Sequence, residues 1–449
     1  MKSIFENFYI GDLLIDKELK EILSTKSSLN AVILFEKKLA EVQGKLGIIP
    51  LKNSQSIKRS LEVNVLKKIK IKKVSTCDGV IIPYLLKEIK SKCLNSDDAQ
   101  YLHYGVTSQD AIDTARNLQI YRFLSYLEKR LDELLIYAAN QSNSFKNLLI
   151  VARTRGQIST LTTLGARYAR IFSPLLKILI KISTIKNTQL NISLGGSSGT
   201  LNILHRFSLD LNKELSKELN LSIAEMPWHN NRQNIVELAS VLTSITSILG
   251  KFGHDVMTMS QSEVREIKIL NSGTSSAMPH KNNPILAEKL IAFSEINLAL
   301  NSIISSSMIH RGERDGIALT KEIITFQQIM YCSGLSSILA FKLFKVIIPN
   351  QVNIKKIIKD THGVIYSETA VYFLSKFMNK NKAEKYVSTA CHLAKKNKST
   401  FIHELKKKIP KNIDVDKIIL NEMNIGLSKE IVKIFYSNIK KSINNKNEC

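Results

Sequence analysis

Apolar residues recur along most of this chain at the three- and four-residue spacing of an amphipathic helix. In residues 31–46, AVILFEKKLAEVQGKL, that spacing predicts one helix, and Gly47 followed by Pro50 predicts its end. The same spacing continues over much longer stretches farther along, at residues 111–144, 163–185, 235–270, 284–308 and 320–346. Helices of this length with few breaking residues are typical of helical bundles. The pattern therefore predicts an all-α fold.

The lengths of the predicted helices change along the chain and suggest three domains. We expect an N-terminal helical domain over residues 1–109 and a central long-helix bundle over 110–350, which contains a polar loop at 268–284. After residue 350 the apolar segments become shorter and lysine becomes more frequent, which predicts a smaller C-terminal domain over 351–449. The central helices exceed what one small domain needs, so we expect them to pack against other copies of the chain.

The composition supports a globular helical protein. Of the 449 residues, 44% are hydrophobic, and 8 prolines with 18 glycines are too few to punctuate the many short strands of a β-sandwich or barrel. The net charge is +25, but lysine and arginine are spread along the whole chain. The densest basic runs, at 67–73 and 406–411, lack the interleaved aromatic residues that stack on bases, so we do not expect nucleic-acid binding.

Cysteine usage and the N-terminus bear on the cellular compartment. The five cysteines show neither a CxxC pair nor a Cys/His metal-ligand spacing, so we expect no disulfide framework and no metal site. Glu6 stands where a secretory signal would need an apolar run, and we expect no membrane-spanning segment elsewhere. These features predict a soluble protein of the cytoplasm.

The segment with the strongest chemical signal is residues 272–288, SGTSSAMPHKNNPILAE. Its first half is small and rich in hydroxyl groups, whereas Asn283 followed by Pro284 is typical of a helix start. Such a loop brings hydroxyls, backbone N–H groups and the cation Lys281 around one point, which suits an anionic substrate or a developing carbanion. The alternative is an ordinary surface loop followed by a helix cap.

Two earlier segments carry complementary polar groups. Residues 103–115, HYGVTSQDAIDTA, predict a helix N-terminus whose Thr107 and Ser108 hydroxyls suit a carboxylate, although the same residues also fit a capping box. In residues 152–157, ARTRGQ, Arg155 offers a fixed charge between the neutral hydrogen-bonding groups of Thr154 and Gln157. The alternative there is a solvated turn that leads into a helix at Ser159.

These three segments, in this order, resemble the signature regions of the fumarase/aspartase superfamily. The third region of that superfamily is usually written GSSxMPxKxNP, and this chain keeps its register from Ser275 onward while Thr274 replaces a glycine. Residues 194–201 and 227–239 further resemble the GGAAGTL and PWHxxRxxxxELA runs of its carboxymuconate cycloisomerase branch. Taken alone, a glycine-rich loop is more often a tight turn than a phosphate cradle, and a Trp beside a His usually packs.

The resemblance implies a reaction by proton transfer next to a carboxylate, through an aci-carboxylate intermediate, without a cofactor. Ser275 is then the base or the acid of the C–H step, and the catalytic set is Ser275, Lys281, Asn283 and Glu288. The substrate-binding set is His103, Thr107, Ser108, Gln109, Thr154, Arg155, Gln157 and Arg314. The resemblance also implies a homotetramer with a 20-helix core, in which three subunits build each site for a small di- or tricarboxylate.

One position separates the branches of the superfamily. Members that use a histidine acid in the second region have Thr-His there, whereas Thr154 is followed here by Arg155, whose guanidinium cannot exchange protons at neutral pH. The cycloisomerase branch also lacks that histidine. Residues 73–83 contain no Arg-His-Asp, and Ile317 and Ile323 stand where a nucleotide-phosphate site would need Ser and Arg. The pattern therefore favours a cycloisomerase over an adenylosuccinate lyase.

Two features leave other functions open. Glu288 keeps a carboxylate that is usual in the lyases of the superfamily, and in this interpretation it pairs with Arg155. The tryptophans that the cycloisomerase branch carries after its Glu-Arg are absent after Glu313 and Arg314. The alternatives are a succinyl-type lyase that releases fumarate and a catalytically inactive family member that acts as a binding protein.

Overall fold

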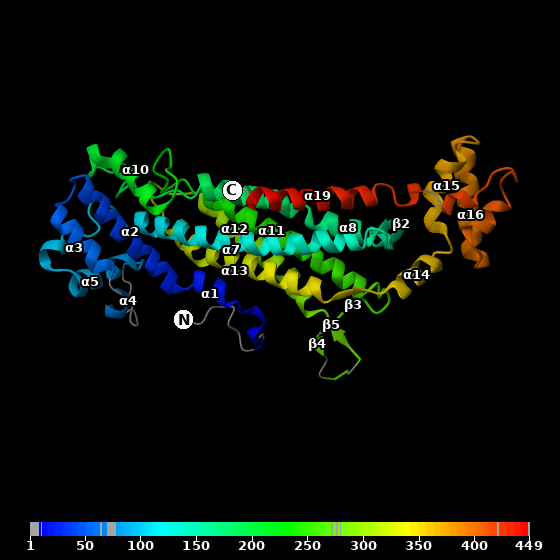
Figure 1. Ribbon diagram of the computed structural model, residues 1–449, viewed down its shortest axis with the longest axis horizontal. Helices are drawn as coiled ribbons and strands as arrows, with labels where there is room; N and C mark the ends of the chain where they lie inside the picture. The colour runs from blue at the N-terminus through cyan, green and yellow to red at the C-terminus, as the bar shows by residue number, and fades with distance from the viewer. Residues whose placement is uncertain are drawn as a thin grey trace. The chain divides into compact units, whose positions relative to one another are not determined.

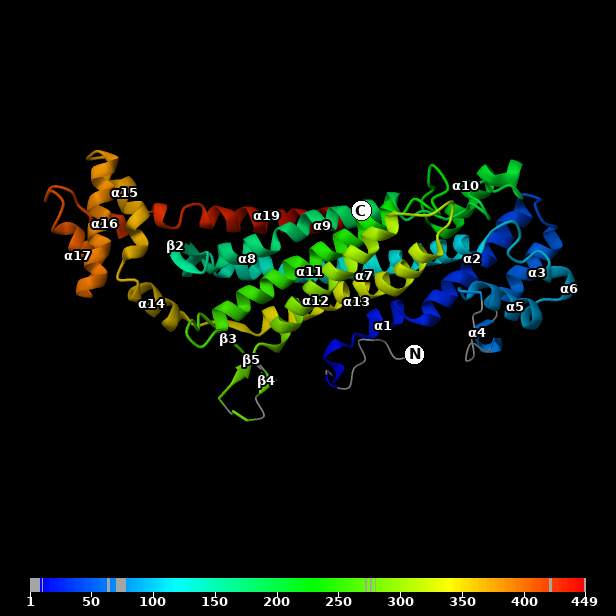
Figure 2. The same cartoon turned by 180° about the vertical axis from the view of Figure 1, so that it is seen from behind.

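The computed structural model describes residue 9 and residues 11–62, 65–69, 78–270, 273–274, 277–278, 280–419 and 422–447. Most of these residues are helical and the strands are few and short, as Figure 1 and the reverse view in Figure 2 show. The predicted all-α fold class is therefore confirmed.

The N-terminal part consists of one long helix among shorter ones. The predicted helix over 31–46 is part of α2, which begins after Ser24, whose hydroxyl accepts a hydrogen bond from the Ser27 amide at 3.1 Å. It ends before Gly47, whose φ of 69° lies in the left-handed region that favours glycine. The elements are η1 (Gly11–Leu14), α1 (Lys17–Ile22), α2 (Thr25–Lys45), α3 (Leu51–Glu62), α4 (Val65–Lys68), α5 (Ile82–Cys93) and α6 (Ser96–Ala99).

Long helices dominate the middle of the chain, as the apolar spacing predicts. Their buried faces are rich in Leu, Ile, Phe and Ala, which explains why a helical period runs through the sequence. The elements are α7 (Ser108–Ser144), α8 (Leu164–Phe172), α9 (Pro174–Thr188), η2 (His205–Phe207), α10 (Ser208–Leu219), α11 (Gln233–Ser260), α12 (Ile285–Ser305), η3 (Ser306–Met308) and α13 (Gly316–Lys345).

Two of the predicted helices differ from the observed ones. The segment 163–185 is two helices, because Pro174 has no amide hydrogen to continue the ladder and therefore begins a new helix, α9. The segment 235–270 is helical only to Ser260, after which the chain enters a short strand. Apolar spacing continues through both points, so the sequence pattern does not reveal either end.

Within the described ranges the strands form three antiparallel pairs: β1 (Leu149–Thr154) with β2 (Gln157–Thr163), β3 (Ile267–Ile269) with β6 (Ile347–Pro349), and β4 (Gly273–Thr274) with β5 (Asn282–Asn283). Arg155 and Gly156 join β1 to β2 with φ angles of 50° and 78°, the left-handed pair of a tight two-residue hairpin. A helix starting at Ser159 is therefore wrong. Ser159 lies in β2, whose threonines and isoleucine favour a strand, and α8 begins at Leu164.

The C-terminal helices are shorter, as predicted. Ala370, Leu374, Ala383, Phe401 and Leu405 form a small apolar core of their own, fully buried. The long final helix α19 then runs alongside α8, as both Figure 1 and Figure 2 show. The elements are α14 (Gln351–Asp360), η4 (Val364–Tyr366), α15 (Ser367–Leu374), α16 (Lys380–Asn397), α17 (Phe401–Lys406), α18 (Asp416–Ile419), η5 (Glu422–Asn424) and α19 (Ser428–Asn447).

The chain divides into two compact units. Unit 1 comprises residues up to 130 together with 178–247 and 293–337, and unit 2 comprises 131–177, 248–292 and the residues from 338 onward. The three sequence domains, 1–109, 110–350 and 351–449, stay a prediction.

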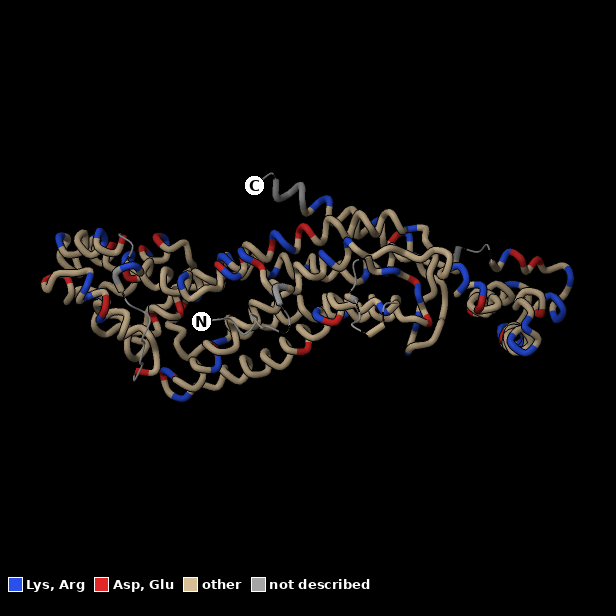
Figure 3. The backbone as a smooth tube through the Cα atoms, turned by 90° about the horizontal axis from the view of Figure 1, so that it is seen from below, with Lys and Arg blue, Asp and Glu red and all other residues tan. Residues whose placement is uncertain are grey.

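Among the described residues, two helices are long and apolar enough to cross a membrane by length and composition alone. They are α11 and α13, and 56% and 72% of their most apolar stretches are buried inside the protein. Burial of this kind is typical of the core helices of a bundle. Lys and Arg are spread along the described helices and alternate with Asp and Glu, so they do not gather in one segment (Figure 3).

Candidate active site

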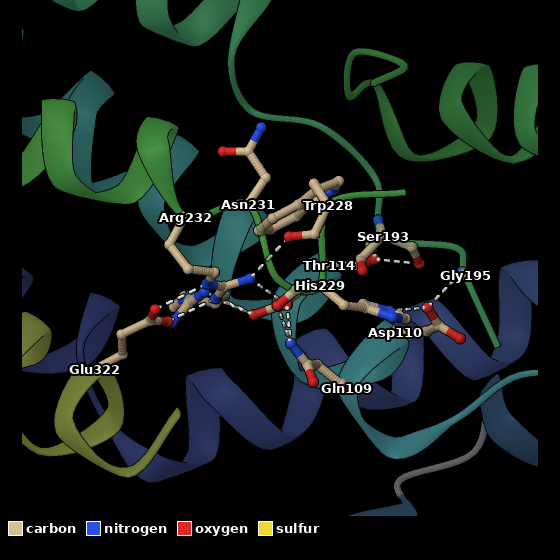
Figure 4. Close-up of polar contacts among 12 residues, drawn as sticks. Gln109, Asp110, Thr114, Ser193, Gly195, Trp228, His229, Asn231, Arg232 and Glu322 are labelled. Atoms are coloured by element: carbon tan, nitrogen blue, oxygen red, sulfur yellow. Dashed lines mark hydrogen bonds and ion pairs between the residues drawn. The ribbon is translucent and has the colours of Figure 1, made fainter. Parts of the chain in front are cut away.

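The site is built around the first turn of α7, in unit 1. Asp110 is fully buried there and accepts four hydrogen bonds. They come from the amide of Thr107 at 2.9 Å, the amides of Gly195 and Gly196 at 2.8 and 3.1 Å, and Nε2 of His229 at 2.7 Å. Figure 4 shows His229 and Gly195 both directed at this carboxylate. One side chain thus joins three distant segments.

The glycine-rich loop is bound to the protein's own carboxylate. A Cβ on Gly195 would lie 2.6 Å from Cε1 of His229, so only glycine fits there. Gly196 has a φ of 66°, which also favours glycine. The loop is therefore a tight turn whose two amides bind the Asp110 carboxylate, and not a loop that holds a phosphate group.

Trp228 and His229 also hold the start of α7 in place. Trp228 donates its indole N–H to the carbonyl of Ile192 at 2.9 Å, and the carbonyl of His229 accepts a hydrogen bond from Gln109 Nε2 at 3.0 Å. Because a carboxylate oxygen only accepts, Nε2 of His229 carries the proton that points to Asp110. The pair therefore positions the start of α7 as well as packing against it.

A buried group of four charges lies one turn farther along α7. Arg232, only 1% exposed, binds both oxygens of Asp113 at 3.0 and 2.9 Å and both oxygens of Glu322 at 2.8 and 2.5 Å. Arg116 binds the same two carboxylates at 2.6 and 2.7 Å. We call these four residues the buried charge cluster; Figure 4 shows the Arg232 side chain directed at Glu322.

Electrostatics keep the carboxylates of this cluster ionised. Burial alone would raise the pKa of Asp113, but Arg232 and Arg116 outweigh burial and lower that pKa to about 2. Glu322 also has a lowered pKa, because the neighbouring Arg116 and Arg232 outweigh its burial. The cluster joins α7 to α13 and to Arg232, the residue before α11, through charged hydrogen bonds, which are stronger than neutral ones.

Two predicted binding residues from opposite parts of the sequence meet in unit 1. Arg314 donates a hydrogen bond from Nη1 to the Thr107 hydroxyl, next to the first residue of α7. The loop that carries Arg314 is fixed by Asp315, whose carboxylate accepts from the amides of Ile317 at 2.7 Å and Arg311 at 3.2 Å. Arg314 is exposed and keeps further N–H donors, so this corner can hold a carboxylate.

The other predicted residues of unit 1 lie in the same region. Ser108 begins α7 and is partly buried, and His103 lies in the turn before it, with Nδ1 2.6 Å from a carboxylate oxygen of Glu36. Gln109 is buried, and its amide donates to the carbonyl of His229 and to Asp113. The side chain of Gln109 therefore faces the interior of unit 1.

The remaining predicted residues belong to unit 2. Thr154, Arg155 and Gln157 are all exposed around the tip of the β1–β2 hairpin. Lys281 and Glu288 are exposed, Asn283 is partly buried on β5, and Ser275 lies outside the described residues. Within the part of the chain that the structure describes, no ion pair joins Glu288 to Arg155. Arg153, two residues before Arg155, instead pairs with the buried Glu266 at 2.8 Å.

Sequence reasoning missed the residues that hold the site together. Asp110, Asp113 and Arg116 stand three apart on one helical face, which was a usable signal of a shared partner. Nothing local in the sequence marks Glu322 or Glu36 as part of the site. Among the described residues, no group of three or more His, Cys, Asp or Glu side chains is arranged to hold a metal ion.

Comparisons with known proteins agree with this architecture. A family model for lyases matches residues 14–295. The 3-carboxy-cis,cis-muconate cycloisomerase of Acinetobacter baylyi is 30% identical over 393 residues, 86% of this chain and 87% of that protein. The adenylosuccinate lyase of Methanocaldococcus jannaschii is 25% identical over 92% of each protein. A crystal structure of β-carboxy-cis,cis-muconate cycloisomerase from Acinetobacter calcoaceticus matches with a TM-score of 0.86 at 26% identity, over 95% of this chain and 99% of that one.

The bundle of long helices is shared with the solved cycloisomerase structure, and the chain is a member of the fumarase/aspartase superfamily. Both the family model and the 30% identical relative span most of the chain. The chain therefore belongs to the lyase family and is an enzyme, a lyase or an intramolecular lyase (cycloisomerase).

The buried charge cluster should contribute strongly to stability. Replacing Arg232 by Met leaves Asp113 and Glu322 with only Arg116 as a cation, and we expect a loss of about 3–5 kcal/mol in the free energy of unfolding. Denaturation by guanidinium, followed by circular dichroism, measures this loss. Lys217→Met, which removes an exposed ion pair with Glu214, is the matched control and should change little. A loss no larger than that of the control would contradict the role given to the cluster.

Proposed function

We propose that the protein is a cycloisomerase that closes 3-carboxy-cis,cis-muconate to a lactone. The observation that supports this most directly is the contact between Arg314 and Thr107 at the N-terminus of α7. It combines a guanidinium, a hydroxyl and free helix amides in one corner, which suits a carboxylate. The names of several relatives, including the Acinetobacter baylyi enzyme, point to the same reaction.

The proposed reaction needs no cofactor. One substrate carboxylate oxygen forms a bond to a carbon of the neighbouring double bond, and the π electron pair moves toward the adjacent carboxylate to give an aci-carboxylate. A proton then bonds to the carbon between them, which restores the carboxylate. The protein's task is to stabilise the extra negative charge, and we assign this to Thr107, Ser108 and Arg314 with Lys281 and Asn283 of the loop. Ser275 carries the proton, as the family resemblance implies.

Arginine at position 155 fits this chemistry. In the reverse direction the group that leaves is a carboxylate, which is stable as an anion and needs no proton from a histidine. A fixed positive charge stabilises the leaving carboxylate, and Arg155 at the exposed hairpin tip supplies one. For an amine leaving group the same position would need an acid, so the substitution supports a carbon–oxygen reaction over a carbon–nitrogen one.

We further propose a cytoplasmic homotetramer that shares its sites between subunits. Support comes from large apolar residues exposed on the long helices of unit 1: Ile296, Leu298 and Ile303 on α12, and Ile323 and Ile324 on α13. Exposed apolar surface on bundle helices is typical of packing against other subunits. The partner in catalysis is a small di- or tricarboxylate.

One observation favours a second candidate, a succinyl-type lyase that releases fumarate. Glu288 is a carboxylate that the superfamily resemblance associates with lyases, and the archaeal adenylosuccinate lyase matches almost the whole chain. The two candidates differ in product, because elimination creates a conjugated double bond in fumarate whereas lactone closure removes one from muconate.

Ultraviolet absorbance distinguishes these functions. We expect the purified protein to remove the absorbance of cis,cis-3-carboxymuconate and to release no fumarate from adenylosuccinate or other substituted succinates. Fumarate release without loss of muconate absorbance would replace the proposal by the lyase. If neither class reacts, the chain is a binding protein that has lost turnover.

Ser275 should be indispensable for turnover. Ser275→Ala removes the hydroxyl that moves the proton but leaves the loop otherwise intact, and we expect kcat to fall by a factor of about 10²–10⁴ with an unchanged circular dichroism spectrum. The matched control is Ser437→Ala on α19, which removes an exposed hydroxyl. Near-normal kcat in Ser275→Ala would remove this serine from the mechanism.

A further inference from the structure

The Glu36–His103 pair is the feature that the family reaction does not explain. Glu36 lies on α2 and is almost completely buried, and its Oε1 lies 2.6 Å from Nδ1 of His103. Its other oxygen, Oε2, is buried without a hydrogen-bond partner in the structure. A buried carboxylate with one unsatisfied oxygen needs a compensating cation, and the imidazolium of His103 is the cation in contact with it.

The charges around His103 favour its protonated form. Burial alone would lower the pKa of His103, but Glu36 outweighs burial and raises that pKa above the ordinary value of 6.5. Asp110 on α7 adds to the increase, and Lys90 on α5 opposes it. With Nδ1–H donated to Glu36, the second N–H of the imidazolium, at Nε2, remains for another acceptor. The His103 side chain is 13% exposed, so it is accessible to a small ligand.

The backbone holds His103 close to Thr107 and its partner Arg314, which we call the carboxylate corner. His103 and Gly105 have φ angles of 64° and 75°, and a Cβ on Gly105 would lie 2.6 Å from the side chain of Leu204. The carbonyl of Tyr104 accepts a hydrogen bond from Gln43 of α2 at 2.8 Å. This fixed turn leads directly to Thr107, which binds Arg314. His103 and Thr107 on this turn, and Arg314 on the loop that contacts it, can therefore each donate a hydrogen bond to a carboxylate.

We propose that Glu36 is a positioning residue that keeps His103 as an imidazolium, and that His103 binds one carboxylate of a tricarboxylate substrate beside the Thr107–Arg314 corner. The proposal rests on the proposed function and assigns one carboxylate of its substrate to His103, with Glu36 as the positioning residue. An enzyme for a monocarboxylate has less need of a second cationic donor beside Arg314, whereas each added carboxylate needs its own charged hydrogen bonds.

The proposal has a defined pH dependence. Because the pKa of His103 is raised, the imidazolium and its contribution to substrate affinity are present at neutral pH and are lost as pH rises through that pKa. Substrate carboxylates stay ionised over this range. Without the Glu36 charge the pKa of His103 falls, so the loss of affinity moves to lower pH while kcat stays near its original value.

The test measures KM and kcat for cis,cis-3-carboxymuconate from pH 5.5 to 9 in the wild type, Glu36→Gln and His103→Asn. At pH 7.5 we expect KM to rise about ten- to a hundredfold in His103→Asn, with kcat changed less than about threefold. In Glu36→Gln the rise of KM with pH should begin at a lower pH than in the wild type. Glu62→Gln on α3 and His392→Asn on α16, both exposed, are the matched controls.

The outcomes separate this proposal from the proposed function. Calorimetric binding of propane-1,2,3-tricarboxylate, an unreactive probe, over the same pH range gives a readout that needs no turnover. Binding with the expected pH dependence but without turnover of muconate supports the pair and overturns the cycloisomerase. Turnover with a KM that neither variant alters supports the cycloisomerase and overturns the pair. A fall in kcat at unchanged KM, or absence of both turnover and tricarboxylate binding, also overturns it. If Glu36→Gln does not fold, His103→Asn decides alone.

Discussion

The burial of two carboxylates at the start of α7 is the constraint on which the rest of the site depends. Asp110 and Asp113 have no exposed surface, and a buried carboxylate is tolerated only with full hydrogen bonding or a paired cation. Asp110 takes its partners from the glycine-rich loop and His229, and Asp113 takes Arg232. Segments far apart in the sequence must therefore fold onto α7 before these charges can be buried.

This constraint explains why the carboxylate corner is rigid before any substrate arrives. Thr107 donates its amide to Asp110, which fixes its hydroxyl at the helix start, and Asp315 fixes the loop of Arg314. Donors that are already in place need no reorganisation when negative charge develops, and such preorganisation is a large part of the stabilisation of carbanion-like states. The exposed groups of unit 2, Arg155 and Lys281, have no such fixed partners among the described residues and are suited to meeting a ligand.

Much of the fold was predictable from the sequence, because helix formation leaves a local period. The long helices α7, α11, α12 and α13 follow directly from it, whereas the break at Pro174 and the end of α11 do not, since the apolar spacing continues through both. The strand over 157–163 is signalled by Arg155–Gly156 and the β-branched residues that follow, although the same residues also fit a turn that leads into a helix.

The site was predictable only in part. Thr107 and Arg314 were both predicted as binding residues from their own segments, and the hydrogen bond between them places the two side chains at one position. Glu322, Glu36 and His229 could not be assigned, because what defines them is a partner tens or hundreds of residues away. A sequence shows which residues are able to carry charge; burial and pairing decide which of them do so in the interior.

The most direct test is a crystal structure of the assembled protein with propane-1,2,3-tricarboxylate bound. The account predicts one ligand carboxylate within hydrogen-bond distance of the Thr107 hydroxyl and the Arg314 guanidinium. A ligand bound elsewhere, with Thr107 and Arg314 facing only solvent or protein, would contradict it.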